Sequence, residues 1–303
     1  MKRQKIHIPG ILGVSIIAFS LFVAVFVYFL APDSSPHANE MHLELSTLPP
    51  GSEVTFIRLN KSQQKSTSFL RRLAFGQKEA FISIPVSSFE LKGDVLNYIP
   101  YGGIHFKTMH NVKLDPNDDT SISYQRKYRL GTDKYGRDLL SRLMVGTRIS
   151  LAVGFISVFI SLLIGISLGL ISGFYGSWID KLVMWFVHVV WSIPTLLMVI
   201  AISLALGKGF WQVFVAVGLC MWVEVARVVR GQVMSVKQKE YILAARVLGF
   251  GDFRIMFRHI LPNILGPIIV ISAANFASAI LIEAGLSFLG IGAKAPMPSW
   301  GAM

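Results

Sequence analysis

The stretch Glu240–Asn263, EYILAARVLGFGDFRIMFRHILPN, decides how this chain folds. It is basic and helix-forming, yet it separates two long and largely apolar stretches, Gly209–Val229 and Ile264–Ile282. A helix needs about 20 apolar residues to cross a hydrocarbon core of about 30 Å. We therefore predict that residues 237–262 form a polar excursion between two membrane spans, long enough to serve as a docking element.

The composition predicts an all-α protein that crosses the membrane several times. Of 303 residues, 53% are hydrophobic and 15% are charged, which is too apolar for an ordinary soluble domain. We predict five spans: Gly10–Leu30, Ile149–Phe174, Leu182–Leu206, Gly209–Val229 and Ile264–Ile282, the last continuing to Ala293. The first could be a signal peptide, but its apolar run exceeds the usual core of about 7–15 residues, so we favour an uncleaved anchor.

The basic residues predict the orientation of these spans. Short loops rich in Lys and Arg remain cytoplasmic, and such residues cluster between Arg227 and Arg258. We therefore place this segment and the N-terminus inside, and residues 31–130 outside. The net charge of +12 then reflects topology and contact with lipid, and we predict no nucleic-acid partner.

Three parts follow along the chain: a tail with the first span (1–33), an extracytoplasmic insert (34–129) and a membrane core (130–303). Alternating β-branched and aromatic residues predict strands at Glu53–Leu59 and Lys78–Val86, so the insert is small and β-rich, with its folded part at 43–112.

Two further helices are expected outside the five spans. Ser68–Phe75 is a candidate short helix within the insert. Apolar residues alternate with Asp138, Arg142 and Arg148 at helical spacing, so we expect an amphipathic helix within Leu130–Ser150, on the outer membrane surface.

Two spans carry packing signals. The second has a small residue at every fourth position, a row that lets helices approach closely in lipid. Its members are Ser157, Ser161, Gly165, Gly169 and Gly173. The third contains Pro194, which removes a backbone hydrogen bond and predicts a kink.

Polar residues inside the last two spans are candidate functional groups. Asn275, Ala279 and Glu283 share one face of the fifth span, and an ionisable residue in a membrane is by default a functional hypothesis. Asn275 and Glu283 could line a translocation pathway; alternatively, Glu283 lies at the outer interface. Glu224 and Arg227 are three residues apart on the fourth span and could form an ion pair at the inner membrane interface, either as a snorkelling pair or with a role in conformational coupling.

Within the polar segment we expect two short helices that break at Gly249. Gly249 can adopt the left-handed helix cap, and Asp252 can cap the next helix. Leu261-Pro262 is expected to end the segment. On the first helix a shared face combines small residues, which permit close approach, with larger anchors for a groove. These residues are Tyr241, Ala244, Ala245 and Leu248.

The Ala244-Ala245 pair, Gly249 and the later Leu261-Pro262 resemble the cytoplasmic "EAA" signature of binding-protein-dependent ABC importer permeases. GTDKYGRDLLSRL from Gly131 and LSFLGIG from Leu286 resemble the second permease subunit of the dipeptide and oligopeptide branch. The resemblance implies a type I ABC importer transmembrane domain. It also implies that the segment docks on an ATPase through Tyr241, Ala244, Ala245, Leu248, Gly249, Leu261 and Pro262.

The resemblance further implies a permease of the bacterial inner membrane that imports peptides. Its partners would be a sister permease, two cytoplasmic ATPases and an extracytoplasmic solute-binding protein. The sequence contains no GxxxxGK[ST] phosphate loop and no nucleophile–base set, so we expect no enzymatic activity, no bound metal or cofactor, and ATP with Mg²⁺ held by the partner ATPases.

Alternatives remain open at this point. Permeases of the same family take nickel chelates or glutathione. A secondary transporter and a membrane-anchored sensor or assembly protein are alternatives of other classes. The family has a sixth span after the segment Pro298–Gly301, whereas this sequence stops at Met303, so we expect the core to lack its final helix.

Overall fold

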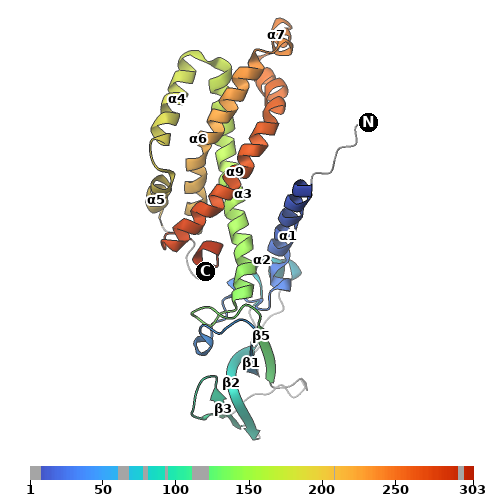
Figure 1. Ribbon diagram of the computed structural model, residues 1–303, viewed down its shortest axis with the longest axis vertical. Coiled ribbons are helices and arrows are strands. Elements are labelled where there is room, and N and C mark those ends of the chain that lie inside the picture. Colours follow the sequence, from blue (N-terminus) through green and yellow to red (C-terminus); the bar gives the residue numbers. More distant parts are fainter. Residues whose placement is uncertain are drawn as a thin grey trace, which may run out of the picture. The chain divides into compact units, whose positions relative to one another are not determined.

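The computed structural model describes residues 8–60, 68–77, 81–92, 95–110, 123–207, 209–292 and 297–303. The chain divides into two compact units (Figure 1). The first comprises Met1–Ile149 with Pro296–Gly301 and Met303, and the second comprises Ser150–Ala295 with Ala302. The basic residues before Ile8 and the predicted end of the fifth span at Ala293 lie outside the described residues.

The first unit contains an apolar helix and an antiparallel sheet. Helix α1 spans Ile8–Leu30 and α2 spans Phe69–Phe75. The five strands are β1 Ser52–Asn60, β2 Phe81–Lys92, β3 Val95–Pro100, β4 Lys107–His110 and β5 Ser123–Tyr128, in the order β4-β3-β2-β1-β5. Short 3₁₀ turns occur at Pro36–Ala38, Leu43–Leu45 and Trp300–Ala302.

The strands β1 and β2 and the helix α2 lie where the sequence predicts them, although Lys78 is outside the described residues. The expected folded part at 43–112 is too short, because β5 pairs along β1 and completes the sheet. Successive side chains of a strand point to opposite faces, so β1 contributes Phe56 to one buried cluster and Ile57 to another.

A charged cluster joins the segment before the sheet to β5. The Glu40 carboxylate accepts hydrogen bonds from Arg126 Nη1 at 2.6 Å and from His42 Nε2 at 3.0 Å. Burial raises the pKa of the Glu40 carboxyl, but the His42 hydrogen bond and the Arg126 guanidinium outweigh burial and bring the pKa to about 2.

This cluster predicts a pH-dependent stability. Because the folded-state pKa of Glu40 lies below its ordinary value of 4.5, its stabilising contribution is complete above pH 4.5 and is lost as the pH falls toward 2. The contribution is on the order of 3 kcal/mol at neutral pH. We expect Glu40→Gln to lower the thermal unfolding temperature of the full chain at pH 7 and to have roughly half of that effect or less at pH 3. An equal loss at both pH values would contradict the prediction.

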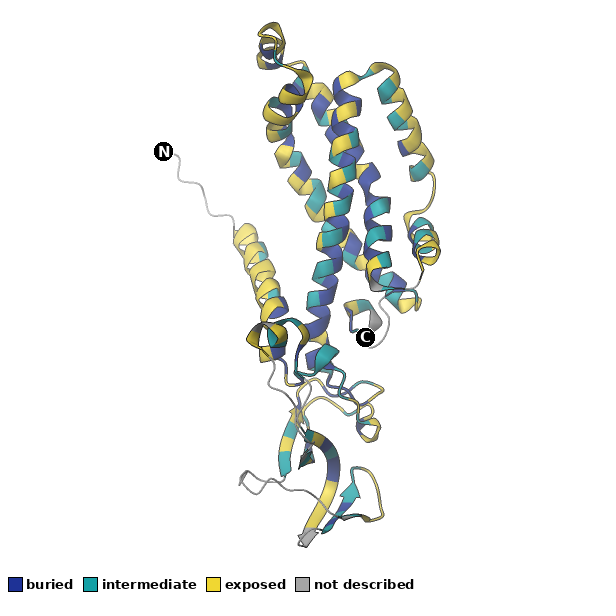
Figure 2. Cartoon of the chain, turned by 180° about the vertical axis from the view of Figure 1, so that it is seen from behind, coloured by how far each residue is buried: buried dark blue, intermediate teal, exposed yellow. Residues whose placement is uncertain are grey.

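The second unit is a helix bundle that begins within α3. Its elements are α3 Leu139–Tyr175, α4 Ser177–Trp191, α5 Thr195–Ala205, α6 Phe210–Lys237, α7 Glu240–Val247, α8 Asp252–Arg254 and α9 Leu265–Phe288. A π-helical turn, Ile255–Ile260, and a 3₁₀ turn, Leu261–Ile264, connect α8 to α9. In Figure 2, buried residues lie along both α3 and α6, whereas α1 of the first unit is largely exposed.

The structure bears out a multi-pass membrane protein. Among the described residues, four helical stretches are long and apolar enough to cross a membrane: Ile8–Leu30, Leu139–Tyr175, Trp211–Lys237 and Asp252–Phe288. The third predicted span is different, because α4 and α5 meet at an angle of 90°. The kink expected at Pro194 is therefore a complete break, in which Ser192 and Ile193 leave the helix and Pro194 precedes the first turn of α5.

The amphipathic helix expected within 130–150 is not a separate element. Its residues from Leu139 onward form the first turns of α3, which continues without interruption to Tyr175. Asp133 does organise the turn before α3: its carboxylate accepts hydrogen bonds from the backbone N–H groups of Tyr135 and Arg137 at 2.8 and 3.0 Å. Asp138 and Arg142 are almost fully buried within the first unit. Their side chains therefore do not form the exposed polar face that an amphipathic helix on a membrane surface would need.

The row of small residues on α3 lies against α6. Ser157 Oγ donates a hydrogen bond to the Phe214 carbonyl oxygen at 3.0 Å. A Cβ atom added at Gly165 would lie 2.6 Å from Val225 Cβ, and one added at Gly169 would lie 2.7 Å from the Ala226 carbonyl oxygen. Gly173 approaches Val233 in the same way, and Ser161 is fully buried. The small side chains therefore permit backbone-to-backbone contact of two spanning helices.

Candidate functional site

The polar segment begins as a short helix that ends at a left-handed glycine. Helix α7 is followed by Leu248 and then by Gly249, whose φ is +77°. The Gly249 N–H donates to the Arg246 carbonyl at 2.9 Å, and the Phe250 N–H donates to the Ala245 carbonyl at 3.1 Å. This is the Schellman arrangement, which satisfies the free carbonyl groups at a helix end. The predicted cap at Gly249 is therefore present.

One face of α7 packs on the bundle. Ile242 and Ala245 are buried in a cluster with Ile255 and Ile260, and Phe250 packs against the same cluster. The expectation that Ala245 meets a partner is wrong for this structure, because the helical phase turns its methyl group toward the chain's own core. A bulky residue at Ala245 would therefore disrupt the bundle itself.

The opposite face presents apolar side chains to the surroundings. Val247 is 89% exposed, Leu248 72% and Phe253 70%. Tyr241, Leu243, Ala244 and Phe257 are also exposed, and the Phe253 and Phe257 rings lie 4.4 Å apart between centroids. Of the predicted docking residues, Tyr241, Ala244, Leu248 and Gly249 thus lie on this open surface. Val247, Phe253 and Phe257 were not predicted as part of this surface. The same segment contains buried apolar residues such as Ile242 and Ile255, so the sequence pattern alone does not distinguish exposed from buried positions.

The end of the segment differs from expectation in two ways. Asp252 is the first residue of α8 and makes no capping hydrogen bond; Gly251 occupies the cap position. Leu261-Pro262 does not end a helix, because the π and 3₁₀ turns carry the helical path into α9. Changes in hydrogen-bond spacing accommodate the N–H that proline lacks, so the helical path continues past Pro262. Leu261 is half-buried and Pro262 is exposed.

The polar stripe on α9 faces the interior of the bundle. Asn275, Ala279 and Glu283 are each at most 1% exposed. Ser287 Oγ donates to Glu283 Oε1 at 2.6 Å, whereas Glu283 Oε2 and Asn275 Nδ2 are buried without a hydrogen-bond partner among the described residues. Glu283 is therefore not at an exposed interface in the second unit. A pathway that contacts Asn275 and Glu283 would require α9 to separate from its neighbours, so their role in transport stays a prediction.

Two arginine side chains of α6 contact residues of α4. Arg230 Nε and Nη2 donate to the two Asp180 carboxylate oxygens at 2.5 and 2.6 Å, which joins α6 to α4. Arg227, expected to pair with Glu224, instead places its guanidinium 3.8 Å from the centre of the Trp191 ring. Within the described part of the chain, no group of three His, Cys, Asp or Glu side chains is placed to hold a metal ion.

A large part of this bundle matches the model of a known protein family. Residues 165–303 match the model of the family described as "Binding-protein-dependent transport system inner membrane component". The matched residues contain the whole polar segment, 237–262, and α9. We refer to the helix bundle of the second unit as the permease domain.

The relatives are peptide and glutathione permeases. Over 173 residues the chain is 43% identical to the oligopeptide transport system permease protein OppC of Bacillus subtilis (strain 168), which covers 57% of each protein. It is 44% identical over 174 residues to the glutathione transport system permease protein GsiD of Pectobacterium atrosepticum, covering 57% of this chain and 58% of that protein. The chain thus spans less than two thirds of the length of these relatives.

Another relative aligns over more of the chain. The dipeptide transport system permease protein DppC of Lactococcus lactis subsp. cremoris is 36% identical over 215 residues, which cover 71% of this chain and 62% of that protein. Among solved structures, the MetNI methionine ABC transporter in an inward-facing conformation is 20% identical, with a TM-score of 0.43, and covers 49% of this chain and 74% of that chain. The β-rich part, whose last strand ends at Tyr128, lies before the family match, which begins at residue 165.

Proposed function

We propose that this chain is a permease subunit of an ATP-driven importer of peptides in the bacterial inner membrane. It forms half of the translocation pathway, together with a sister permease. Two cytoplasmic ATPases supply the hydrolysis of ATP with Mg²⁺, and an extracytoplasmic solute-binding protein delivers the substrate. The names of the relatives and the family of residues 165–303 support this assignment.

The observation that carries the proposal is the apolar surface of α7 and α8. Val247, Leu248 and Phe253 are largely exposed on a segment otherwise rich in charge. An exposed apolar helix face suits insertion into a groove of a partner protein, where apolar anchors contribute most of the affinity. Arg246, Arg254 and Arg258 are exposed on the same segment, and they would contribute a polar rim to the apolar contact.

The test replaces an anchor without disturbing the bundle. Leu248→Asp places a charge on a side chain that is already 72% exposed, so the fold of the chain should be retained. We expect the variant to enter the membrane normally and to lose at least about tenfold in ATPase-subunit binding, the loss typical of an interface hot spot. Co-purification of the ATPases and peptide-stimulated ATP hydrolysis in liposomes measure this effect.

A matched control is Ile104→Asp, since Ile104 is 87% exposed and belongs to the first unit. It should leave co-purification unchanged. Normal coupling in Leu248→Asp would reject the docking assignment. Uptake that continues in wild-type liposomes without ATP would favour a secondary transporter. Normal transport after removal of the β-rich insert would argue against a sensor whose outer part is the functional one.

A further inference from the structure

Glu224 is an exposed carboxylate in the middle of a spanning helix. It lies 14 residues after the start of α6 and 13 before its end, which places it about 20 Å from either terminus. Glu224 makes no hydrogen bond or ion pair with any residue that the structure describes, and its surface is not covered by the permease domain. Glu224 lies within the predicted span Gly209–Val229, three residues before Arg227, and therefore toward its inner end. A charged side chain within a span faces a bundle interior or a water-filled cavity, because exposure to lipid is costly.

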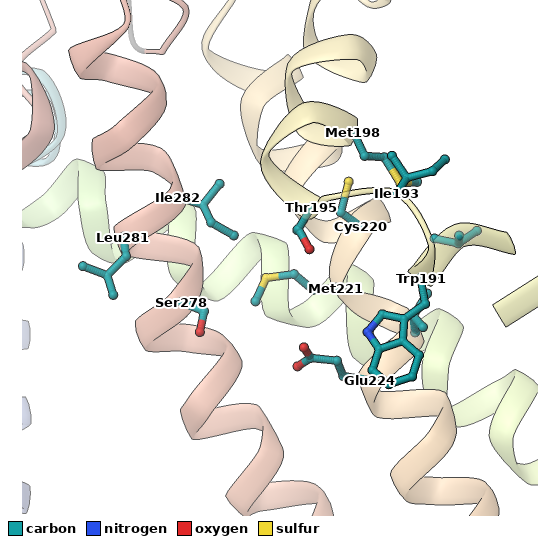
Figure 3. Close-up of a pocket in the computed structure, with 12 residues that line it drawn as sticks. Trp191, Ile193, Thr195, Met198, Cys220, Met221, Glu224, Ser278, Leu281 and Ile282 are labelled. Carbon is teal, nitrogen blue, oxygen red and sulfur yellow. The ribbon is translucent and has the colours of Figure 1, made fainter. Parts of the chain in front are cut away.

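A cavity of about 360 Å³ opens beside this carboxylate. Figure 3 shows its walls: Met221 and Glu224 from α6, Thr195 and Met198 from α5, and Ser278 with Ile282 from α9. The break between α4 and α5 brings Trp191 to the same space. The volume falls within the range of small-ligand sites, which combine apolar walls with a few polar groups. The lining residues with polar side-chain groups are Glu224, with its carboxylate, Ser278 and Thr195, with their hydroxyls, Trp191, with its indole N–H, and Cys220, with its thiol.

The neighbouring cation does not neutralise Glu224. The Arg227 guanidinium stacks over the Trp191 ring, and Arg227 lines a second cavity, of about 550 Å³, that also contacts Trp191 and Glu224. Two adjoining cavities therefore share a wall and differ in charge: the first has Glu224 as its only charged lining residue, and the second adds Arg227. A zwitterion could place its ammonium group at Glu224 and its carboxylate toward Arg227.

We propose that Glu224 and the cavity between α5, α6 and α9 form a subsite within the membrane that binds the ammonium group of a passing peptide. The proposal rests on the proposed function for its choice of substrate. Glu224 selects the positive group, Ser278 and Thr195 supply hydroxyl oxygens as further acceptors, and the methionine side chains form a deformable apolar wall that tolerates different side chains.

The first test measures the electrostatic property of the cavity without any transport. Ser278→Cys is introduced into the Cys220→Ser chain, and the assembled protein in membranes reacts with methanethiosulfonate reagents of equal size and opposite charge. After correction for reactivity with a free thiol, we expect the cationic trimethylammonioethyl reagent to react about tenfold faster than the anionic sulfonatoethyl reagent. Glu224→Gln should bring the ratio close to one, while Glu44→Gln, an exposed carboxylate of the first unit, should leave it unchanged.

The second test measures selectivity during import. In liposomes, Glu224→Gln should raise the KM for a dipeptide with a free amino group about tenfold and should leave the KM for its N-acetylated form unchanged. Glu224→Asp should restore most of the difference, and co-purification of the ATPases should be normal.

The outcomes separate the two proposals. A labelling ratio that Glu224→Gln does not change, or a cysteine at position 278 that reacts with neither reagent until the protein is denatured, overturns the subsite. An equal loss of import for both peptide forms also overturns it, because the residue then supports structure alone. Wild-type liposomes that import neither peptide reject the proposed function, whereas the labelling ratio still decides whether the cavity binds cations.

Discussion

Replacing Gly169 with leucine is expected to separate α3 from α6 and to abolish the folded permease domain. Even a Cβ atom at this position would lie 2.7 Å from both the Ala226 carbonyl oxygen and Val229 Cβ, so the backbone has no room to accommodate a larger side chain. Overpacking of a core costs about 1–3 kcal/mol and more where the contact is backbone. We expect at least about 3 kcal/mol here, measured as the free energy of unfolding in mixed detergent micelles.

Gly231→Leu is the matched control for this change. Gly231 is a glycine of α6, in the same helix pair, but a Cβ atom there would meet nothing within 4 Å. Leucine has a better helix propensity than glycine by up to about 1 kcal/mol, so the control should leave stability unchanged or raise it. Similar destabilisation by both variants would show that the helix contact is not the cause.

The second large effect is expected when Asp180 is removed. Asp180 receives two hydrogen bonds from Arg230 and one from Ser172 Oγ, so Asp180→Ala leaves the guanidinium and the hydroxyl without their acceptor. The Asp180 side chain is 18% exposed and that of Arg230 27%, so the pair is only partly hydrated. Charge-assisted bidentate pairs in such positions are stronger than surface pairs. We expect a loss of about 2 kcal/mol in the free energy of unfolding.

A double-mutant cycle with Arg230→Ala tests the pairwise origin of this loss. The coupling energy should account for most of it, because both single changes remove the same interaction. Lys127–Glu53 in the first unit offers a comparison: its side chains are 60% and 54% exposed, and such pairs contribute about 0–1 kcal/mol. A coupling between Asp180 and Arg230 no larger than that of Lys127–Glu53 would contradict the prediction.

Periodic features of the sequence predicted the fold well because they report local geometry. The four-residue spacing from Ser157 to Gly173 implied a close helix contact, and the structure places α6 there. The lengths of the apolar stretches identified α1, α3, α6 and α9 as spans. Gly249 was predictable as a cap because its backbone conformation is one that other residues rarely adopt.

Features that depend on tertiary contacts were not predictable from the sequence. A proline signals a lost hydrogen bond, but Pro194 and Pro262 have opposite outcomes: a 90° break at the first and a continued helical path at the second. The direction of Ala245 depends on the helical phase relative to Ile255 and Ile260, which a single helix does not reveal. Glu224 was noted only as a partner for Arg227, because the aromatic contact of Arg227 arises from the distant residue Trp191.

The continuous helical path from α8 into α9 has a mechanical consequence. Phe253 and Ser278 are 25 residues apart on this path, so about 38 Å separates the exposed tip from the cavity wall. A stiff helix transmits a translation or rotation of one end to its other end. The turns between Ile255 and Ile264, where the hydrogen-bond spacing changes twice, are its most compliant part. The stiffness of these turns then determines how much a displacement of Phe253 moves Ser278 and changes the width of the cavity.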